Sequence, residues 1–113
     1  MNRKVFWSRS AEKSLEDILD YIIEHDGKSM AFKIYNKIKK QSTLLKVSPF
    51  QGREVKEMKS LKKKYKEIIV SPWRIIYTIE KNIVHVLLVI DARRDLDEIL
   101  YEMIINIDDY STT

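Results

Sequence analysis

The sequence of 113 residues contains no cysteine and only two glycines, two prolines and two histidines. Without cysteine it has no disulfide scaffold, thiol nucleophile, cysteine-type zinc site or iron–sulfur cluster. Gly27 and Gly52 stand far apart and form no glycine-rich loop that binds a phosphate. His25 and His85 do not have the spacing of metal ligands either. We therefore expect neither a metal ion nor a cofactor.

Long apolar runs are missing as well. No apolar stretch reaches the length of about 18 residues that spans a membrane, and no signal-type stretch follows residues 1–4. Neither a linker nor an internal repeat divides the chain, and its length is that of one domain. We expect a single cytoplasmic domain over residues 1–113 with no membrane partner, in which residues 108–113 form a frayed tail.

Charge is unevenly distributed along the chain. The formal net charge is +4, but residues 1–90 carry +9 and residues 91–113 carry −5. A basic body favours an anionic partner, either a nucleic acid or an acidic protein segment. A lysine-rich surface that only keeps the protein soluble explains the same charges, so charge alone does not identify the partner.

The first half of the chain predicts two helices. Apolar residues at helical spacing form one stripe, Ala11, Leu15, Ile18 and Ile22, and a second, Ala31, Ile34, Ile38 and Leu45. Ser8 or Ser10 is suited to cap the first helix, and Asp26–Gly27 is suited to end it. The second helix is expected to begin near Ser29 and to stop before Pro49. Because only two or three residues join them, the helices should pack as an antiparallel hairpin.

Three extended runs in the second half predict an antiparallel meander. They cover residues 65–70, 73–80 and 83–90. Ser71–Pro72 and Lys81–Asn82 are short enough for tight turns, and asparagine tolerates the positive φ that such turns require. The third run is apolar at nearly every position, which is typical of a central strand covered on both faces.

The remaining segments complete the predicted order of elements. Residues 4–7 form a short strand, residues 50–64 form a loop, and Asp95 with Glu98 forms a capping box that starts a last helix. The order is then β-α-α-β-β-β-α. We predict an α+β fold in which a small, mainly antiparallel sheet packs against a helical hairpin.

Basic side chains are the candidates for binding or chemistry. Arg74 stands in an apolar strand, where its guanidinium must either be paired or line a functional groove. Arg93 and Arg94 lie between the last strand and the last helix, where they can bind an anion or bridge to nearby carboxylates. Residues 56–66 contain six lysines together with Tyr65, which suits either a nucleic-acid backbone or a solvated loop.

Five segments occur in an order and spacing that are specific as a set, between about residue 5 and residue 104. The first is residues 10–22, with Ser-Ala-Glu, Leu-Glu-Asp-Ile and Tyr-Ile in that order. The other four are Pro-Phe-Gln-Gly-Arg-Glu-Val at 49–55, Lys-Glu-Ile-Ile-Val at 66–70, Trp-Arg-Ile-Ile-Tyr at 73–77 and Arg-Arg-Asp-Leu at 93–96. With these segments the chain resembles the ParE/RelE superfamily, small bacterial toxins of type II toxin–antitoxin systems. The order of elements in that family is the one predicted above.

Two functions are found within this family. RelE-like members are ribosome-dependent mRNA endonucleases, whereas ParE-like members inhibit DNA gyrase. The segments at 52–55, 67–70 and 92–96 are more similar to the ParE branch. The resemblance therefore implies a plasmid-stabilisation-type toxin that inhibits DNA gyrase and arrests replication. The alternatives are an mRNA interferase and a module that has lost its toxicity but still binds an antitoxin.

The resemblance also implies partners and site residues. A cognate acidic antitoxin would wrap the toxin and fold upon binding, and DNA would be bound only through that complex. Contacts with the antitoxin or with gyrase are expected at Arg53, Arg74, Arg93 and Arg94. The endonuclease alternative has the ribosome and mRNA as partners, and its expected catalytic residues are Lys66, Arg74, Arg94 and Tyr101.

Overall fold

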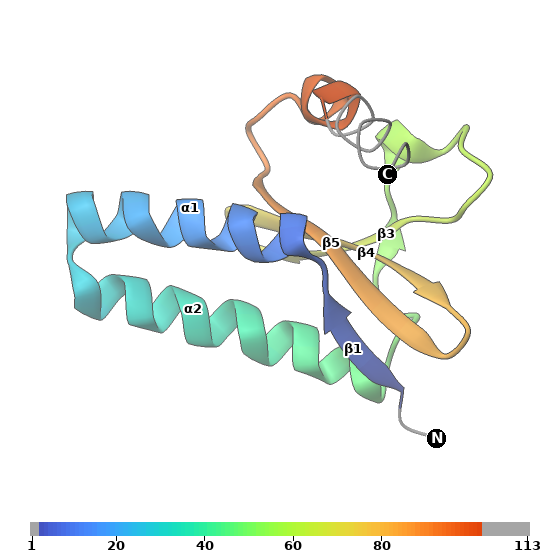
Figure 1. The fold of residues 1–113 in the computed structure, drawn as a ribbon, viewed down its shortest axis with the longest axis horizontal. Coiled ribbons are helices and arrows are strands. Elements are labelled where there is room, and N and C mark those ends of the chain that lie inside the picture. Colours follow the sequence, from blue (N-terminus) through green and yellow to red (C-terminus); the bar gives the residue numbers. More distant parts are fainter. Residues whose placement is uncertain (1–2, 103–113) are drawn as a thin grey trace.

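The computed structural model describes residues 3–102, which form a five-stranded mixed sheet with helices on both faces (Figure 1). The strands are β1 (Lys4–Trp7), β2 (Arg53–Glu54), β3 (Lys66–Val70), β4 (Trp73–Glu80) and β5 (Ile83–Asp91). The helices are α1 (Arg9–Asp26), α2 (Lys28–Thr43) and a C-terminal helix that is described over residues 96–102. The predicted frayed tail at 108–113 lies outside the described residues.

The order of the strands in the sheet is β1-β5-β4-β3-β2. β3, β4 and β5 pair antiparallel, which confirms the predicted meander, and β1 pairs parallel to β5. The turn between β4 and β5 holds Lys81 and Asn82 at φ values of 50° and 65°, in the left-handed region that asparagine tolerates. β5 lies between two strands, as its nearly continuous apolar sequence predicts.

The antiparallel helical hairpin is formed by α1 and α2 (Figure 1). Ser8 caps α1, because its side-chain oxygen accepts a hydrogen bond from the Ala11 amide at 3.0 Å. Gly27 joins the two helices at a φ of 93°, and its amide donates to the Ile22 and Ile23 carbonyls. α2 ends at Thr43 and continues as a short 3₁₀ helix, Leu44–Lys46. Both helices therefore form as predicted.

Two apolar clusters hold the layers together, one on each face of the sheet. The first lies between the hairpin and the sheet and includes Leu15, Ile38, Ile75 and Tyr77. The second lies on the opposite face, and it joins Val55, Met58, Ile76, Leu88, Ile90 and Leu96. The two faces of β4 alternate between these clusters, as expected for a strand that is covered on both sides.

The segment between α2 and β3, predicted as a loop over 50–64, contains two short elements. β2 pairs with β3, and a 3₁₀ helix spans Lys56–Met58. Because Met58 is buried in the second cluster, this segment folds back over the sheet. Within residues 3–102 no helix has the length and apolar character needed to cross a membrane.

Candidate functional site

Arg74 lies inside the molecule and is fully engaged in ion pairs. Its Nε donates to Oε1 of Glu67 at 2.6 Å, and its Nη1 and Nη2 donate to the two carboxylate oxygens of Glu57, both at 2.9 Å. Arg74 is 8% exposed and Glu67 is 3% exposed. Arg53 extends the chain of charges outward, since its Nε donates to Oε2 of Glu67 at 2.9 Å. Of the two alternatives for Arg74, the structure shows the paired one.

Within this chain of ion pairs, the contact between Arg74 and Glu57 favours the charged form of both side chains. The hydrogen bonds that Arg74 donates to Glu57 have the largest influence on the arginine pKa, and together with Glu67 they raise it despite the opposing effect of burial. The hydrogen bond from Arg74 in turn lowers the pKa of Glu57 below its ordinary value of 4.5. The bidentate pair thus attaches the 3₁₀ helix at Lys56–Met58 to the sheet.

Lys66 lies on the opposite face of the sheet from Arg74. It pairs across the sheet with Tyr77, which belongs to the cluster under the helical hairpin. Its Nζ donates to the Gly52 carbonyl oxygen at 3.3 Å. Arg74 pairs with Ile69 and contacts Glu67, whose cross-strand partner Ile76 belongs to the other cluster. Lys66 and Arg74 therefore do not form one electropositive cradle.

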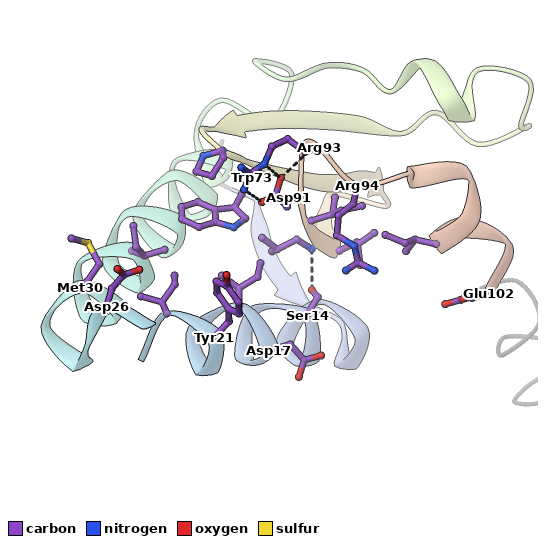
Figure 2. Close-up of a pocket in the computed structure, with 18 residues that line it drawn as sticks. Ser14, Asp17, Tyr21, Asp26, Met30, Trp73, Asp91, Arg93, Arg94 and Glu102 are labelled. Atoms are coloured by element: carbon purple, nitrogen blue, oxygen red, sulfur yellow. Dashed lines mark hydrogen bonds and ion pairs between the residues drawn. The ribbon is translucent and has the colours of Figure 1, made fainter. Parts of the chain in front are cut away.

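A groove of about 720 Å³ lies between α1, the start of α2 and the end of the sheet where β4 begins and β5 ends. Its walls are mainly apolar, with Ile22, Trp73 and Leu88 among them, and Tyr21 of α1 also lines it (Figure 2). The Val89 amide donates to Ser14 Oγ at 3.0 Å, and this bond attaches α1 to β5 beside the groove (Figure 2). A concave apolar surface with a few polar groups is typical of a binding site.

Arg93 and Arg94 both line this groove, but they are held differently. Arg93 is exposed and chelates Asp91, with Nε and Nη2 donating to the two carboxylate oxygens at 2.9 and 2.6 Å. This hydrogen bond lowers the pKa of Asp91 to about 2. The Arg94 guanidinium makes no hydrogen bond or ion pair with residues 3–102, and Figure 2 shows it pointing toward α1. Arg94 is therefore the arginine of the pair that is available to a ligand.

Tyr101 is exposed on the C-terminal helix and lines a second groove of about 660 Å³ on the other side of that helix. That groove also contains Tyr65, His85 and Leu100. Arg94 belongs to the first groove and Tyr101 to the second, and neither groove contains Lys66 or Arg74. The structure thus disperses the four side chains of the endonuclease hypothesis.

The lysine-rich run at 56–66 is neither an extended basic arm nor free of partners. Glu57 binds Arg74, and Lys63 forms an exposed ion pair with Glu80 at 2.9 Å. Lys59, Lys62 and Lys64 are exposed. Exposed single ion pairs contribute little to stability, so this run is held in place by Met58 and Glu57 rather than by its lysines.

Sequence reasoning missed Glu57 and Glu67 as the partners of Arg74. Glu67 carried a usable signal, because a hairpin turn at Ser71–Pro72 places residue 67 opposite residue 76 and on the same face as Arg74. Glu57 carried none, because the segment that contains it has no periodicity from which its position on the sheet can be inferred.

Comparisons with known proteins agree with this architecture. A family model described as the ParE toxin of the type II toxin–antitoxin system, parDE, matches residues 5–96. A solved structure, the chromosomal ParDE toxin–antitoxin system from P. aeruginosa, matches with a TM-score of 0.67 and 18% identity, over 79% of this chain and 95% of that chain. No curated protein sequence matches significantly. At 18% identity the structural likeness establishes the α+β fold alone. The family match covers most of the sequence and therefore establishes the family. The chain therefore belongs to the ParE toxin family of type II toxin–antitoxin systems.

Proposed function

We propose that this ParE-type toxin inhibits DNA gyrase and that a cognate acidic antitoxin neutralises it. The observation that carries the proposal is the family match over residues 5–96, which is to the ParE toxin. The segments at 52–55, 67–70 and 92–96, which are similar to the ParE branch, lie at β2, β3 and the loop before the C-terminal helix.

The positions of the basic residues support an inhibitor that binds protein over an enzyme that cleaves RNA. Cleavage at a 2′-hydroxyl needs a base, a group that stabilises the phosphorane and an acid within reach of one another. Lys66 and Arg74 face opposite sides of the sheet, and Arg94 and Tyr101 line different grooves. Arg74 is also engaged with two carboxylates, which removes it from contact with a phosphate.

The first groove is the surface that we assign to partner contact. Its apolar walls suit the apolar side of an amphipathic segment, and Arg94 at its edge suits a carboxylate of that segment. We expect Arg93 to contact the partner while it stays bound to Asp91. Arg53 would contact the partner outside this groove, through its exposed surface. Arg74 acts through its neighbours, as the residue that positions Glu57 and Glu67.

The decisive experiment combines purified toxin with gyrase and plasmid DNA, and separately with a translating cell-free extract. We expect loss of supercoiling or accumulation of cleaved plasmid in the first reaction, and intact mRNA 5′ ends in the second. Ribosome-dependent mRNA cleavage would replace this proposal with the interferase function. Activity in neither reaction would favour a module that has lost toxicity.

A single variant tests the assigned surface independently of the target. Arg94→Ala should weaken gyrase inhibition or antitoxin binding about tenfold or more, as expected for a charged contact in an interface. Arg9→Ala removes an exposed arginine at the start of α1, away from the groove, and should change neither. If both variants behave as the wild type, the toxin function stands and the groove is not the contact surface.

A further inference from the structure

α2 and the segment after it form the longest acid-free stretch of the sequence. Between Asp26 and Glu54 the chain has seven lysine or arginine residues and no aspartate or glutamate. Five of the lysines lie in α2 itself, which has a net charge of +5. α1, its partner in the hairpin, has a net charge of −4. The two antiparallel helices thus carry opposite charges.

Three of these lysines share one exposed side of α2. Lys33, Lys37 and Lys40 are spaced four and three residues apart, which places them on one helical face, and all three are exposed. Within residues 3–102 no lysine of α2 forms an ion pair, either with α1 or with the sheet. Figure 1 shows α2 at the border of the molecule, with α1 on one side and no element on the other. We call these three residues the lysine face.

The lysine face lowers the stability of α2. Lysines at spacings of three and four repel one another along a helix. Lys28 stands in the first turn of α2, where an acidic residue complements the helix dipole, and that turn has no acidic residue and no side-chain cap. Local features that oppose stability are concentrated at functional surfaces, so this charge pattern points to a role in binding.

We propose that the lysine face binds the phosphate backbone of duplex DNA without reading its sequence. Lysine ammonium groups act as point charges on phosphates, and binding is driven by release of the counterions that surround DNA. Lys33 and Lys40 are about 10 Å apart along the helix axis, a length that covers about three successive phosphates of one strand. The acidic α1 favours an orientation in which α2 faces the DNA.

This inference departs from the expectation that DNA is bound only through the antitoxin complex. It concerns non-specific phosphate contact by the toxin itself, and it does not depend on the gyrase target. An acidic amphipathic peptide is the competing occupant, but such a peptide needs an apolar groove for its apolar side. The first groove includes α2 only near its start, through Met30 and Ile34, and the second groove contains no residue of α2.

The test is fluorescence anisotropy of a labelled duplex of about 20 base pairs with arbitrary sequence, titrated with toxin from about 50 to about 200 mM salt. The variant is the triple Lys33→Gln, Lys37→Gln, Lys40→Gln. Its matched control is the triple Lys59→Gln, Lys62→Gln, Lys64→Gln, which removes the same charge from exposed lysines on the other side of the molecule. Circular dichroism checks that both variants keep the wild-type fold.

We expect the wild type to bind with a log affinity that falls linearly with log salt. The lysine-face triple should lose about tenfold or more in affinity at low salt and about two to three units of salt slope, since each phosphate contact contributes about 0.9. The control triple should stay within about twofold of the wild type. Equal losses in both triples would overturn the assignment, because net charge alone would then explain binding.

A second titration with a labelled glutamate-rich peptide separates the two anionic partners. If the lysine-face triple loses peptide binding but keeps its DNA affinity and salt slope, the surface belongs to an acidic protein and the proposal is wrong. Absence of wild-type DNA binding at the lowest salt would also overturn it. No gyrase is present in either titration, so failure here leaves the proposed target unaffected.

Discussion

Single residues acquire their roles from partners that are distant in the sequence. Arg74 is separated from Glu67 by seven positions and from Glu57 by seventeen, yet both carboxylates accept its hydrogen bonds. A buried charge is tolerated only when it is paired and hydrogen-bonded, so the network makes Arg74 a structural residue. Tyr77 is a comparable case, because its buried hydroxyl accepts from the Gly52 amide and donates to the Pro49 carbonyl.

The two arginines bound to Glu67 should differ strongly in their contribution to stability. Arg74→Ala leaves the buried Glu67 with only its exposed partner, and we expect a loss of about 3–5 kcal/mol in the free energy of unfolding. Arg53→Ala removes the exposed partner and should cost less than about 1 kcal/mol. Urea denaturation measures both changes.

The Arg74→Ala variant also separates a structural role of Arg74 from a direct contact with gyrase. If Arg74→Ala unfolds at the wild-type urea concentration and yet loses inhibition, Arg74 contacts the target itself. In that case the assignment of Arg74 as a positioning residue is wrong, whatever the behaviour of Arg53→Ala.

At the scale of elements, the segment from β2 to β3 shows how a loop is ordered without regular structure. Met58 in the second apolar cluster and Glu57 on Arg74 are among the contacts that attach it to the sheet. Short local hydrogen bonds, such as that from the Met58 amide to the Val55 carbonyl, complete the 3₁₀ helix. The lysines of this segment are thereby displayed on a fixed backbone.

Glu57→Gln should loosen this segment while leaving the rest of the fold intact. The loss of a charged bidentate hydrogen bond is expected to cost about 1–2 kcal/mol at neutral pH. Amide hydrogen exchange at Met58, Lys59 and Leu61 should accelerate, whereas amides in α1 should be unaffected. Glu54→Gln, on the exposed strand β2, is the control and should change neither quantity.

The difference in unfolding free energy between the wild type and Glu57→Gln should change with pH in a defined direction. The hydrogen bond from Arg74 lowers the pKa of Glu57 below its ordinary value of 4.5. Ionised Glu57 therefore stabilises the fold fully at pH values above 4.5, and this stabilisation is lost as the pH falls through the lowered pKa. The gap in unfolding free energy between the wild type and Glu57→Gln should therefore shrink between neutral pH and acid. A gap that is constant down to pH about 2 would contradict the ion pair.

For the whole molecule, the central observation is that one sheet serves two cores. Ile75 and Ile76 are adjacent in β4 and almost completely buried, but they belong to clusters on opposite faces. The helical hairpin covers one face, and the β2–β3 segment with the C-terminal helix covers the other (Figure 1). Because both cores share β4 and β5, loss of either should unfold the other.

Ile75→Ala and Ile76→Ala form a matched pair that tests this coupling. Each should lower the free energy of unfolding by about 2–5 kcal/mol, as expected for truncation of a buried isoleucine. Trp7 and Trp73 pack against the hairpin-side cluster, so tryptophan fluorescence follows that face. We expect Ile76→Ala, on the other face, to shift the fluorescence midpoint in urea as much as the midpoint in circular dichroism. An unchanged fluorescence midpoint would show that the faces unfold separately.

The sequence by itself determined the two long helices and the strands of the meander, because these depend on local patterns. Apolar spacing placed α1 and α2, and Asn82 marked a turn with positive φ. The five segments that resemble the toxin family also needed only their order and spacing, and the family match over 5–96 confirms them.

Only the tertiary structure decided which candidate side chains meet. The sequence left Arg74 either paired or lining a groove, and the outcome depended on how the aperiodic β2–β3 segment folds back to bring Glu57 to the sheet. Strand register, rather than residue type, placed Lys66 and Arg74 on opposite faces. The groove that holds Arg94 exists because α1 packs beside the end of β5. Such contacts join residues far apart in the chain, and no local pattern encodes them.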